Sequence, residues 1–128
     1  MEYRILDEVI ECLIDYRGKT PKKSDNGIKM LSAKTVKMGF IDYENAYTIS
    51  KEEFKKFAVR GDIKKGDILV TTEAPLGCIA KLSRDDVGIA QRLIALRGKE
   101  NVLDNDFLLY FLMSKEGQHE LLSRETGT

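Results

Sequence analysis

The sequence has few of the residues on which metal-dependent and redox chemistry rely. It contains one histidine, His119, and two cysteines, Cys12 and Cys78, in 128 residues. Zinc sites need several such ligands, often with a C-x2-C spacing that is missing here, so we expect no bound metal. Each cysteine lies inside an apolar run, where a reduced core residue is expected. The signatures G-x-G-x-x-G, P-loop and G-x-S-x-G are also missing, so we expect no cofactor.

Long apolar runs are absent as well. No stretch approaches the roughly 20 apolar residues of a membrane-spanning helix, and the charged N-terminus MEYRILDEVIE is unlike a signal peptide. Hydrophobic residues make up 42% of the chain and charged residues 33%, which is typical of globular proteins. We therefore expect a cytoplasmic protein with no membrane contact.

Neither sign of charge is in excess, because 21 basic residues balance 21 acidic ones. This balance argues weakly against nucleic-acid binding, since most such domains are basic. The distribution is uneven, however. Residues 17–37 contain seven Lys or Arg and one Asp, whereas residues 98–128 contain three Lys or Arg and six acidic residues. Such a molecule can bind a polyanion on one side only.

Three strand-like runs form the clearest structural pattern. They are residues 67–71, 78–82 and 89–96. Val, Ile and Thr in these runs favour a pleated, half-buried surface. Residues 72–77 separate the first two runs, and Pro75 and Gly77 predict a loop there because proline cannot join a strand ladder.

The first fifty residues give weaker signals. The predicted segments are a helical turn leading into a strand (3–14), a loop (15–27), a short strand (28–31), a helical turn closed by Gly39 (32–37) and an extended segment (40–43). The loop prediction rests on its two glycines, its proline and the turn signal Asp25-Asn26-Gly27.

Two N-cap signals place the helices. Ser50 and Glu53 match a capping box that opens a helix to about residue 58, and Asp104 has the chemistry of an N-cap for the final helical region. The side chains expected to face the core are Phe54, Phe57 and Ala58 in the first helix, and Phe107, Leu108, Phe111 and Leu112 in the second. We expect Gly117 to end the second helix and residues 118–123 to form a shorter one.

This order of elements predicts the α+β class. We expect a single domain over residues 1–128, with short, mostly antiparallel twisted strands, a mid-chain helix and C-terminal helices. The chain stops at residues 124–128 without a capping element, which suggests a domain excised from a longer subunit.

Few residues suggest catalysis. Asp85 and Asp86 could act as paired carboxylates or ligate a metal, but a hairpin turn between two strands is the simpler interpretation. His119 lies in a polar helical stretch and is expected at the surface. A small phosphate-ester hydrolase using these three residues is thus the weakest of the functional hypotheses.

The basic residues before position 38 suggest phosphate binding. Gly18 would allow close approach of the backbone to a phosphate, and Lys, Arg, Thr and Ser are phosphate donors. The candidates for DNA-backbone contact are Arg17, Lys19, Lys22, Lys23, Lys34 and Lys37. A solvated surface loop is the alternative. Tyr16, Tyr43 and Tyr47 could stack on bases or serve structural roles.

A second candidate group surrounds the predicted loop at residues 72–77. Gln91 can bind adenine and Arg92 can bind guanine in the major groove, or either can support that loop through hydrogen bonds. Glu73 can accept from cytosine N4 or pair with Arg92. Together with Thr72, these residues are the candidates for base readout or its support.

The order of several motifs resembles the target recognition domain of type I restriction-modification DNA specificity subunits. The matching segments are Gly18-Lys19-Thr20-Pro21, residues 66–71, Gly77 with its strand, residues 90–96, residues 110–114 and residues 126–128. The resemblance covers nearly the whole chain. It implies a non-enzymatic domain that reads one half of a split double-stranded DNA target, while separate modification and restriction subunits methylate and cleave.

The leading hypothesis is therefore sequence-specific binding of double-stranded DNA in a type I complex. The acidic C-terminal region supports an alternative, a protein-interaction module that docks on a modification partner without reading DNA.

Overall fold

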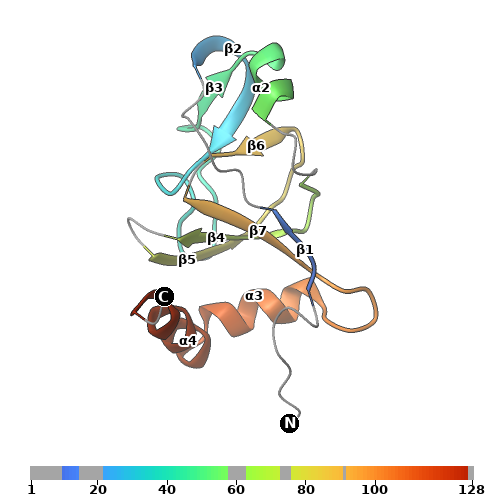
Figure 1. Cartoon of the computed structure of the whole chain (residues 1–128), viewed down its shortest axis with the longest axis vertical. Helices are drawn as coiled ribbons and strands as arrows, with labels where there is room; N and C mark the ends of the chain where they lie inside the picture. Colours follow the sequence, from blue (N-terminus) through green and yellow to red (C-terminus); the bar gives the residue numbers. More distant parts are fainter. Residues whose placement is uncertain (1–9, 15–21, 58–62, 73–75, 91, 127–128) are drawn as a thin grey trace.

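Two small β-sheets and a pair of C-terminal helices form successive layers of the fold (Figure 1). The structure is a computed structural model, and it describes residues 10–14, 22–57, 63–72, 76–90 and 92–126. The predicted α+β class is confirmed. Predictions for residues 3–9, 16 and 58 fall outside the described residues.

The four-stranded sheet lies in the middle layer, next to the C-terminal helices. Its strands are β1 (Ile10–Ile14), β4 (Ile68–Thr72), β5 (Leu76–Lys81) and β7 (Leu93–Gly98), in the antiparallel order β1-β7-β4-β5. Side chains alternate along β4: Leu69 enters the core shared with the second sheet, while Ile68 and Val70 enter the core shared with the helices. Both faces of this sheet are therefore covered, which explains its continuous apolar sequence.

The three-stranded sheet forms the opposite end of the molecule. Its strands are β2 (Lys23–Leu31), β3 (Tyr47–Ile49) and β6 (Val87–Ile89), in the order β3-β2-β6. β2 runs antiparallel to β3 and parallel to β6. Helix α2 (Lys51–Phe57) follows β3, and its Phe54 packs against Met30 and Ile49. The Ser50 Oγ accepts from the Glu53 N–H at 3.1 Å, which confirms the predicted N-cap.

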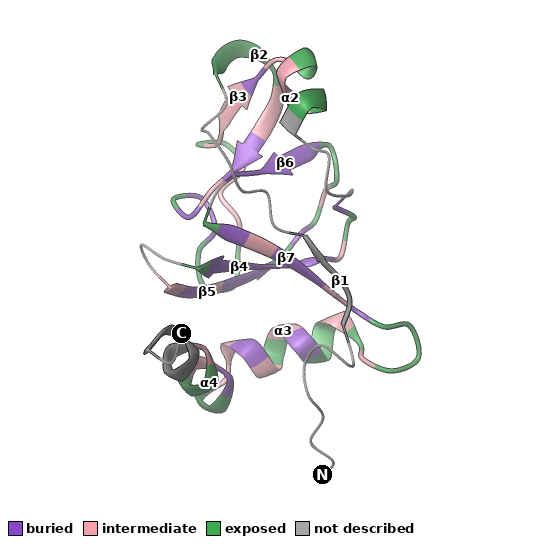
Figure 2. Ribbon diagram, viewed as in Figure 1, coloured by how far each residue is buried: buried purple, intermediate pink, exposed green. Residues whose placement is uncertain are grey.

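The C-terminal helices cover the free face of the four-stranded sheet (Figure 2). They are α3 (Asn105–Met113) and α4 (Lys115–Thr126). Asp104 caps α3 as predicted, because its Oδ1 accepts from the Asp106 N–H at 2.7 Å. Leu108 and Leu112 are buried against this sheet, and Phe111 packs at its margin. No helix in the described ranges is long and apolar enough to cross a membrane.

The third predicted strand is wrong, because residues 89–96 belong to two different sheets. β6 ends at Ile89 in the three-stranded sheet, and β7 begins at Leu93 in the four-stranded one. Between them Arg92 adopts a left-handed backbone with φ of 70°. The apolar run continues across this kink because both strands face the core between the sheets.

The predicted loop at residues 15–27 is also partly wrong, because β2 already starts at Lys23. Its register shifts so that Lys23 and Ile28 both lie opposite Ile49. The turn signal Asp25-Asn26-Gly27 therefore forms an irregularity within a strand. At Gly27, where φ is 135°, a Cβ would lie 2.0 Å from the Ile49 carbonyl oxygen. Glycine permits this close approach.

Two predictions about the final helices need correction. The break falls at Ser114, whose Oγ accepts from the Gly117 N–H at 3.1 Å, so Gly117 lies inside α4. Phe107 is 57% exposed and does not face the core.

Candidate nucleic-acid interface

Two of the proposed base-reading residues, Thr72 and Arg92, lie side by side where β4 and β7 pair. Thr71 lies opposite Leu93 in the register of these strands. The Thr72 N–H donates to the Arg92 carbonyl oxygen at 2.9 Å, and both residues are exposed. The structure thus joins the end of β4 to the kink before β7 by a backbone hydrogen bond. Glu73 and Gln91 lie outside the described residues.

The hairpin between β4 and β5 is anchored on both sides of its tip. The buried Thr71 Oγ1 accepts from the Cys78 N–H at 2.8 Å, and Thr72 lies opposite Leu76. From α4, the Gln118 Nε2 donates to the Gly77 carbonyl oxygen at 2.9 Å. Sequence reasoning missed both Thr71 and Gln118, because their partners depend on strand pairing and on the packing of α4. Cys78 is a free, half-buried cysteine beside the core, as predicted.

The structure describes four of the lysines that we expect to contact the DNA backbone, and these four form two groups. Lys22 and Lys23 are exposed at the start of β2, and the Lys23 Nζ lies 5.3 Å from the centroid of the Tyr47 ring. Lys34 and Lys37 are exposed in the connection after β2. These groups lie at opposite ends of the strand, so the structure does not gather all four lysines at one point. Arg17 and Lys19 fall outside the described residues.

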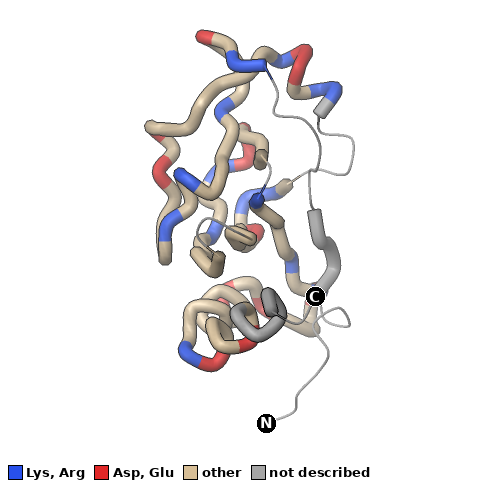
Figure 3. The backbone as a smooth tube through the Cα atoms, turned by 60° about the vertical axis from the view of Figure 1, so that its left-hand side comes forward, with Lys and Arg blue, Asp and Glu red and all other residues tan. Residues whose placement is uncertain are grey.

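Helix α2 adds exposed lysines that the sequence analysis did not select. They are Lys51, Lys55 and Lys56. The helix lies beside β2 at the end of the molecule formed by the three-stranded sheet (Figure 1). Figure 3 shows basic positions over this end and along one side of the molecule, with acidic positions between them. The spacing of Lys51 and Lys55, one helical turn apart, was the available signal.

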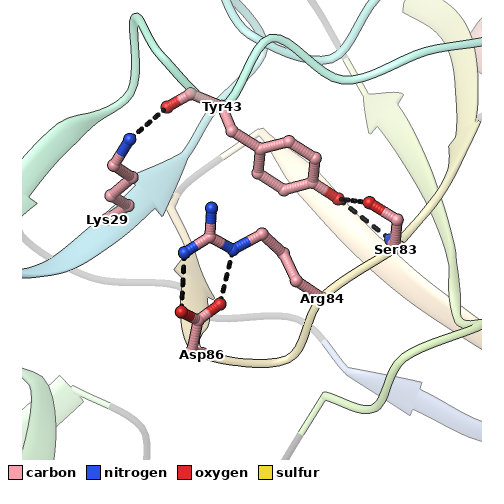
Figure 4. Close-up of polar contacts among 5 residues, drawn as sticks. All are labelled: Lys29, Tyr43, Ser83, Arg84 and Asp86. Carbon is pink, nitrogen blue, oxygen red and sulfur yellow. Dashed lines mark hydrogen bonds and ion pairs between the residues drawn. The ribbon is translucent and has the colours of Figure 1, made fainter.

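A polar cluster joins β2, the connection after β2 and the connection after β5 (Figure 4). The Tyr43 hydroxyl oxygen lies 2.9 Å from both the Ser83 backbone N and the Ser83 Oγ, so it accepts from the N–H. The Lys29 Nζ donates to the Tyr43 carbonyl oxygen at 3.2 Å. Tyr43 is therefore structural, in agreement with the second of its two interpretations.

Arg84 and Asp86 complete the cluster as a bidentate ion pair. The Arg84 Nε and Nη2 donate to the two Asp86 carboxylate oxygens, each at 2.6 Å. These hydrogen bonds lower the pKa of the Asp86 carboxyl and raise that of the Arg84 guanidinium. Asp85 and Asp86 do not form the predicted hairpin turn, because β5 and β6 belong to different sheets. With both oxygens bound by Arg84, Asp86 is poorly placed for catalysis or metal binding.

Other features of catalytic or metal sites are weak in the described part of the chain. His119 is exposed on α4. Within the described ranges, no group of three or more His, Cys, Asp or Glu residues is placed to hold a metal ion. The arrangement is suited to binding, with anchored loops and exposed cations, rather than to bond-making chemistry.

Comparison with known families gives a match to the type I restriction modification DNA specificity domain over residues 1–128. The chain belongs to this family. The DNA specificity domain is a non-catalytic component of type I restriction-modification systems. No curated protein matches the chain.

Two solved structures are similar in fold to this chain. The HsdS subunit from Thermoanaerobacter tengcongensis is 25% identical, with a TM-score of 0.60 over 91% of this chain and 27% of that one. The second structure concerns complex assembly and conformational transition of the type I R-M system. It is 21% identical, with a TM-score of 0.60 over 89% of this chain and 27% of that one. The specificity domain described here thus spans about a quarter of each relative.

Proposed function

We propose that this chain is one target recognition domain and that it reads one half of a bipartite double-stranded DNA target. The observation that carries the proposal is the family match over the whole chain. Exposed Thr72 and Arg92, held together by the hydrogen bond between their backbones, would approach the base edges. Lys22, Lys23, Lys34 and Lys37 would contact phosphates, as would Arg17 and Lys19.

The partners in this proposal are the modification and restriction subunits of a type I complex, which would supply methylation and cleavage. The family membership and the similarity to HsdS support them. The chain would then be one recognition domain within a longer cytoplasmic subunit.

The first test is selection of bound duplexes from a randomised pool by the 128-residue chain, followed by sequencing. We expect enrichment of a motif of a few base pairs, which would be one half of the target. Binding that is sensitive to salt but enriches no motif would contradict sequence reading by this chain alone. Absence of binding at low ionic strength would contradict DNA recognition altogether.

Arg92→Gly tests base readout without damaging the backbone. Residues other than glycine occupy the left-handed region at a cost of about 1 kcal/mol, so glycine suits the φ of 70° at this position. We expect relaxed preference at one base pair of the enriched motif, and a Tm measured beside it separates this effect from any loss of stability. An unaltered motif would remove Arg92 from base readout.

The alternative function, docking on a protein without reading DNA, is favoured by one observation. Phe107 and Tyr110, one turn apart on α3, are 57% and 70% exposed. Copurification of the chain with the modification subunit of its own system, together with failure to bind DNA, would support this alternative. Loss of the complex in Phe107→Ala would place the contact on α3.

A further inference from the structure

The connection between β2 and β3 contains a rigid hairpin whose tip is apolar and exposed. Val36 and Ile41 form an antiparallel bridge, and the Lys37 N–H donates to the Phe40 carbonyl oxygen at 2.9 Å. We call residues 37–40 the hairpin tip. At this tip Met38 is 45% exposed and Phe40 is 61% exposed. Folding thus leaves much of both apolar side chains in contact with water, where their burial could still stabilise a complex.

The tip is held in place at its base and at its side. Val36 is 1% exposed in the core between the sheets, and Ile41 packs against that core. The Gly39 N–H donates to the Ile79 carbonyl oxygen on the edge strand β5 at 2.7 Å. Gly39 has a φ of 92°, and a Cβ there would lie 3.4 Å from the Met113 Cε of α3. These contacts fix the direction in which the tip projects, so its exposed side chains are presented on a rigid support.

The surroundings of the tip favour a polyanion over an apolar partner. Lys37 lies on the tip and Lys34 on the turn that leads to it, and both are exposed. Two acidic residues, Asp42 and the exposed Glu44, follow the tip, and the Asp42 carboxylate is held by Asn45, whose Nδ2 and backbone N–H donate to it at 2.6 and 3.3 Å. The tip thus presents an exposed aromatic residue on the same short connection as two exposed lysines. Proteins that press Phe or Met against base steps, with Lys on the adjacent phosphates, use this combination.

We propose that the hairpin tip is a second DNA contact, in which Phe40 packs against or between bases in a groove while Lys34 and Lys37 bind the flanking phosphates. The inference rests on the proposed function, and it adds an apolar, salt-independent contact to it. Met38 would widen the apolar surface against the same base step. Pyrimidine–purine steps, which unstack most easily, would be the preferred position.

Phe40→Ala in the 128-residue chain, with the selected duplex as ligand, tests this proposal. We expect affinity to fall about tenfold, as for the loss of one base–aromatic contact, with the salt dependence unchanged. Lys37→Ala should instead reduce the salt slope by about one ion. Because Phe40 is 61% exposed, its removal should leave the Tm unchanged.

Phe107→Ala is the matched control, because Phe107 is 57% exposed but lies on α3. We expect it to leave DNA affinity unchanged. 2-Aminopurine placed along the duplex should brighten at one step with the parent chain and not with Phe40→Ala, which would show unstacking at the tip.

The outcomes separate this inference from the function on which it rests. If the parent chain selects a motif but Phe40→Ala binds it equally well and gives the same 2-aminopurine signal, the tip does not touch DNA and this inference is overturned. If the parent chain selects no motif, the proposed function fails first. Retained affinity in Phe40→Tyr would support an aromatic contact.

Discussion

At the scale of single residues, the structure depends on polar contacts that join distant parts of the chain. Asp67 is 2% exposed, and both its carboxylate oxygens are bound by Arg97, at 2.7 Å from Nε and 2.8 Å from Nη2. The Lys64 N–H donates to the same carboxylate at 2.8 Å. This buried pair ties the entry of β4 to β7. It is the strongest candidate for a structural ion pair in the described residues.

Asp67→Ala should therefore destabilise the fold severely. Removing the buried carboxylate takes the bidentate partner from the Arg97 guanidinium and the acceptor from the Lys64 N–H, and breaking a buried pair in this way typically costs about 3–5 kcal/mol. Urea unfolding would measure the loss. The exposed pair between Lys81 and Asp106 provides the control, because Asp106→Ala should cost far less than loss of the buried carboxylate. Equal losses in the two variants would contradict the assignment.

The Arg84–Asp86 pair makes a prediction about pH. Hydrogen bonds from Arg84 lower the pKa of the Asp86 carboxyl in the folded chain. Its contribution to stability is therefore present above the unfolded pKa of about 3.9 and is lost as pH falls through the lower folded value. Arg84→Ala should raise the pKa of Asp86 towards 3.9, as followed by carboxyl-carbon NMR. The pKa of Asp42, lowered mainly by Asn45, should stay unchanged.

At the scale of elements, close contacts between helices decide which positions tolerate a side chain. Gly117 lies in the first turn of α4, where α4 crosses the end of α3. A Cβ at this position would lie 2.0 Å from the Phe111 carbonyl oxygen and 2.8 Å from the Leu112 Cα. Helix propensity therefore favours a side chain at position 117, whereas the close contact between the two helices excludes one.

Gly117→Ala should destabilise the protein, although alanine in a helix interior normally adds about 1 kcal/mol over glycine. The two helices would have to separate, and Leu112 would lose part of its packing. Differential scanning calorimetry should show a lower Tm. Glu116→Ala, at an exposed position in the same turn, is the control for propensity alone. A higher Tm in Gly117→Ala would show that the helices can move apart freely.

At the scale of the whole molecule, the two charge-biased parts of the sequence occupy different layers. Residues 22–37 form β2 and the connection after it, while α3 and α4, on the far side of the four-stranded sheet, carry acidic residues (Figure 1). This arrangement agrees with a polyanion that binds mainly over β2 and the connection after it, in spite of a net charge of zero. The hairpin tip, beside Met113 of α3, is the part of this basic segment that comes near the C-terminal helices.

Lys22→Ala and Lys115→Ala test this separation, because both lysines are exposed but lie on different layers. Lys22→Ala should weaken binding to all duplexes and reduce the salt slope by about 0.9, since one phosphate contact is lost. Lys115→Ala on α4 should leave affinity and slope unchanged. The measurement is DNA affinity at several salt concentrations. Identical salt slopes in the two variants would remove Lys22 from the interface.

The sequence by itself determined the local features of this protein. The N-caps at Ser50 and Asp104, strands β4 and β5 of the middle sheet and the α+β class follow from rules that act over a few residues, and the order of motifs indicated the family. Tertiary structure alone decided that residues 89–96 divide between two sheets, and that Arg97 engages Asp67.

The same holds for the hairpin tip, where Gly39 binds Ile79, and for the contact of Gln118 with Gly77. These partners lie about 40 residues apart, so no local pattern specifies them. They form because burial of both faces of the middle sheet brings its edge strand against the hairpin and the last helix.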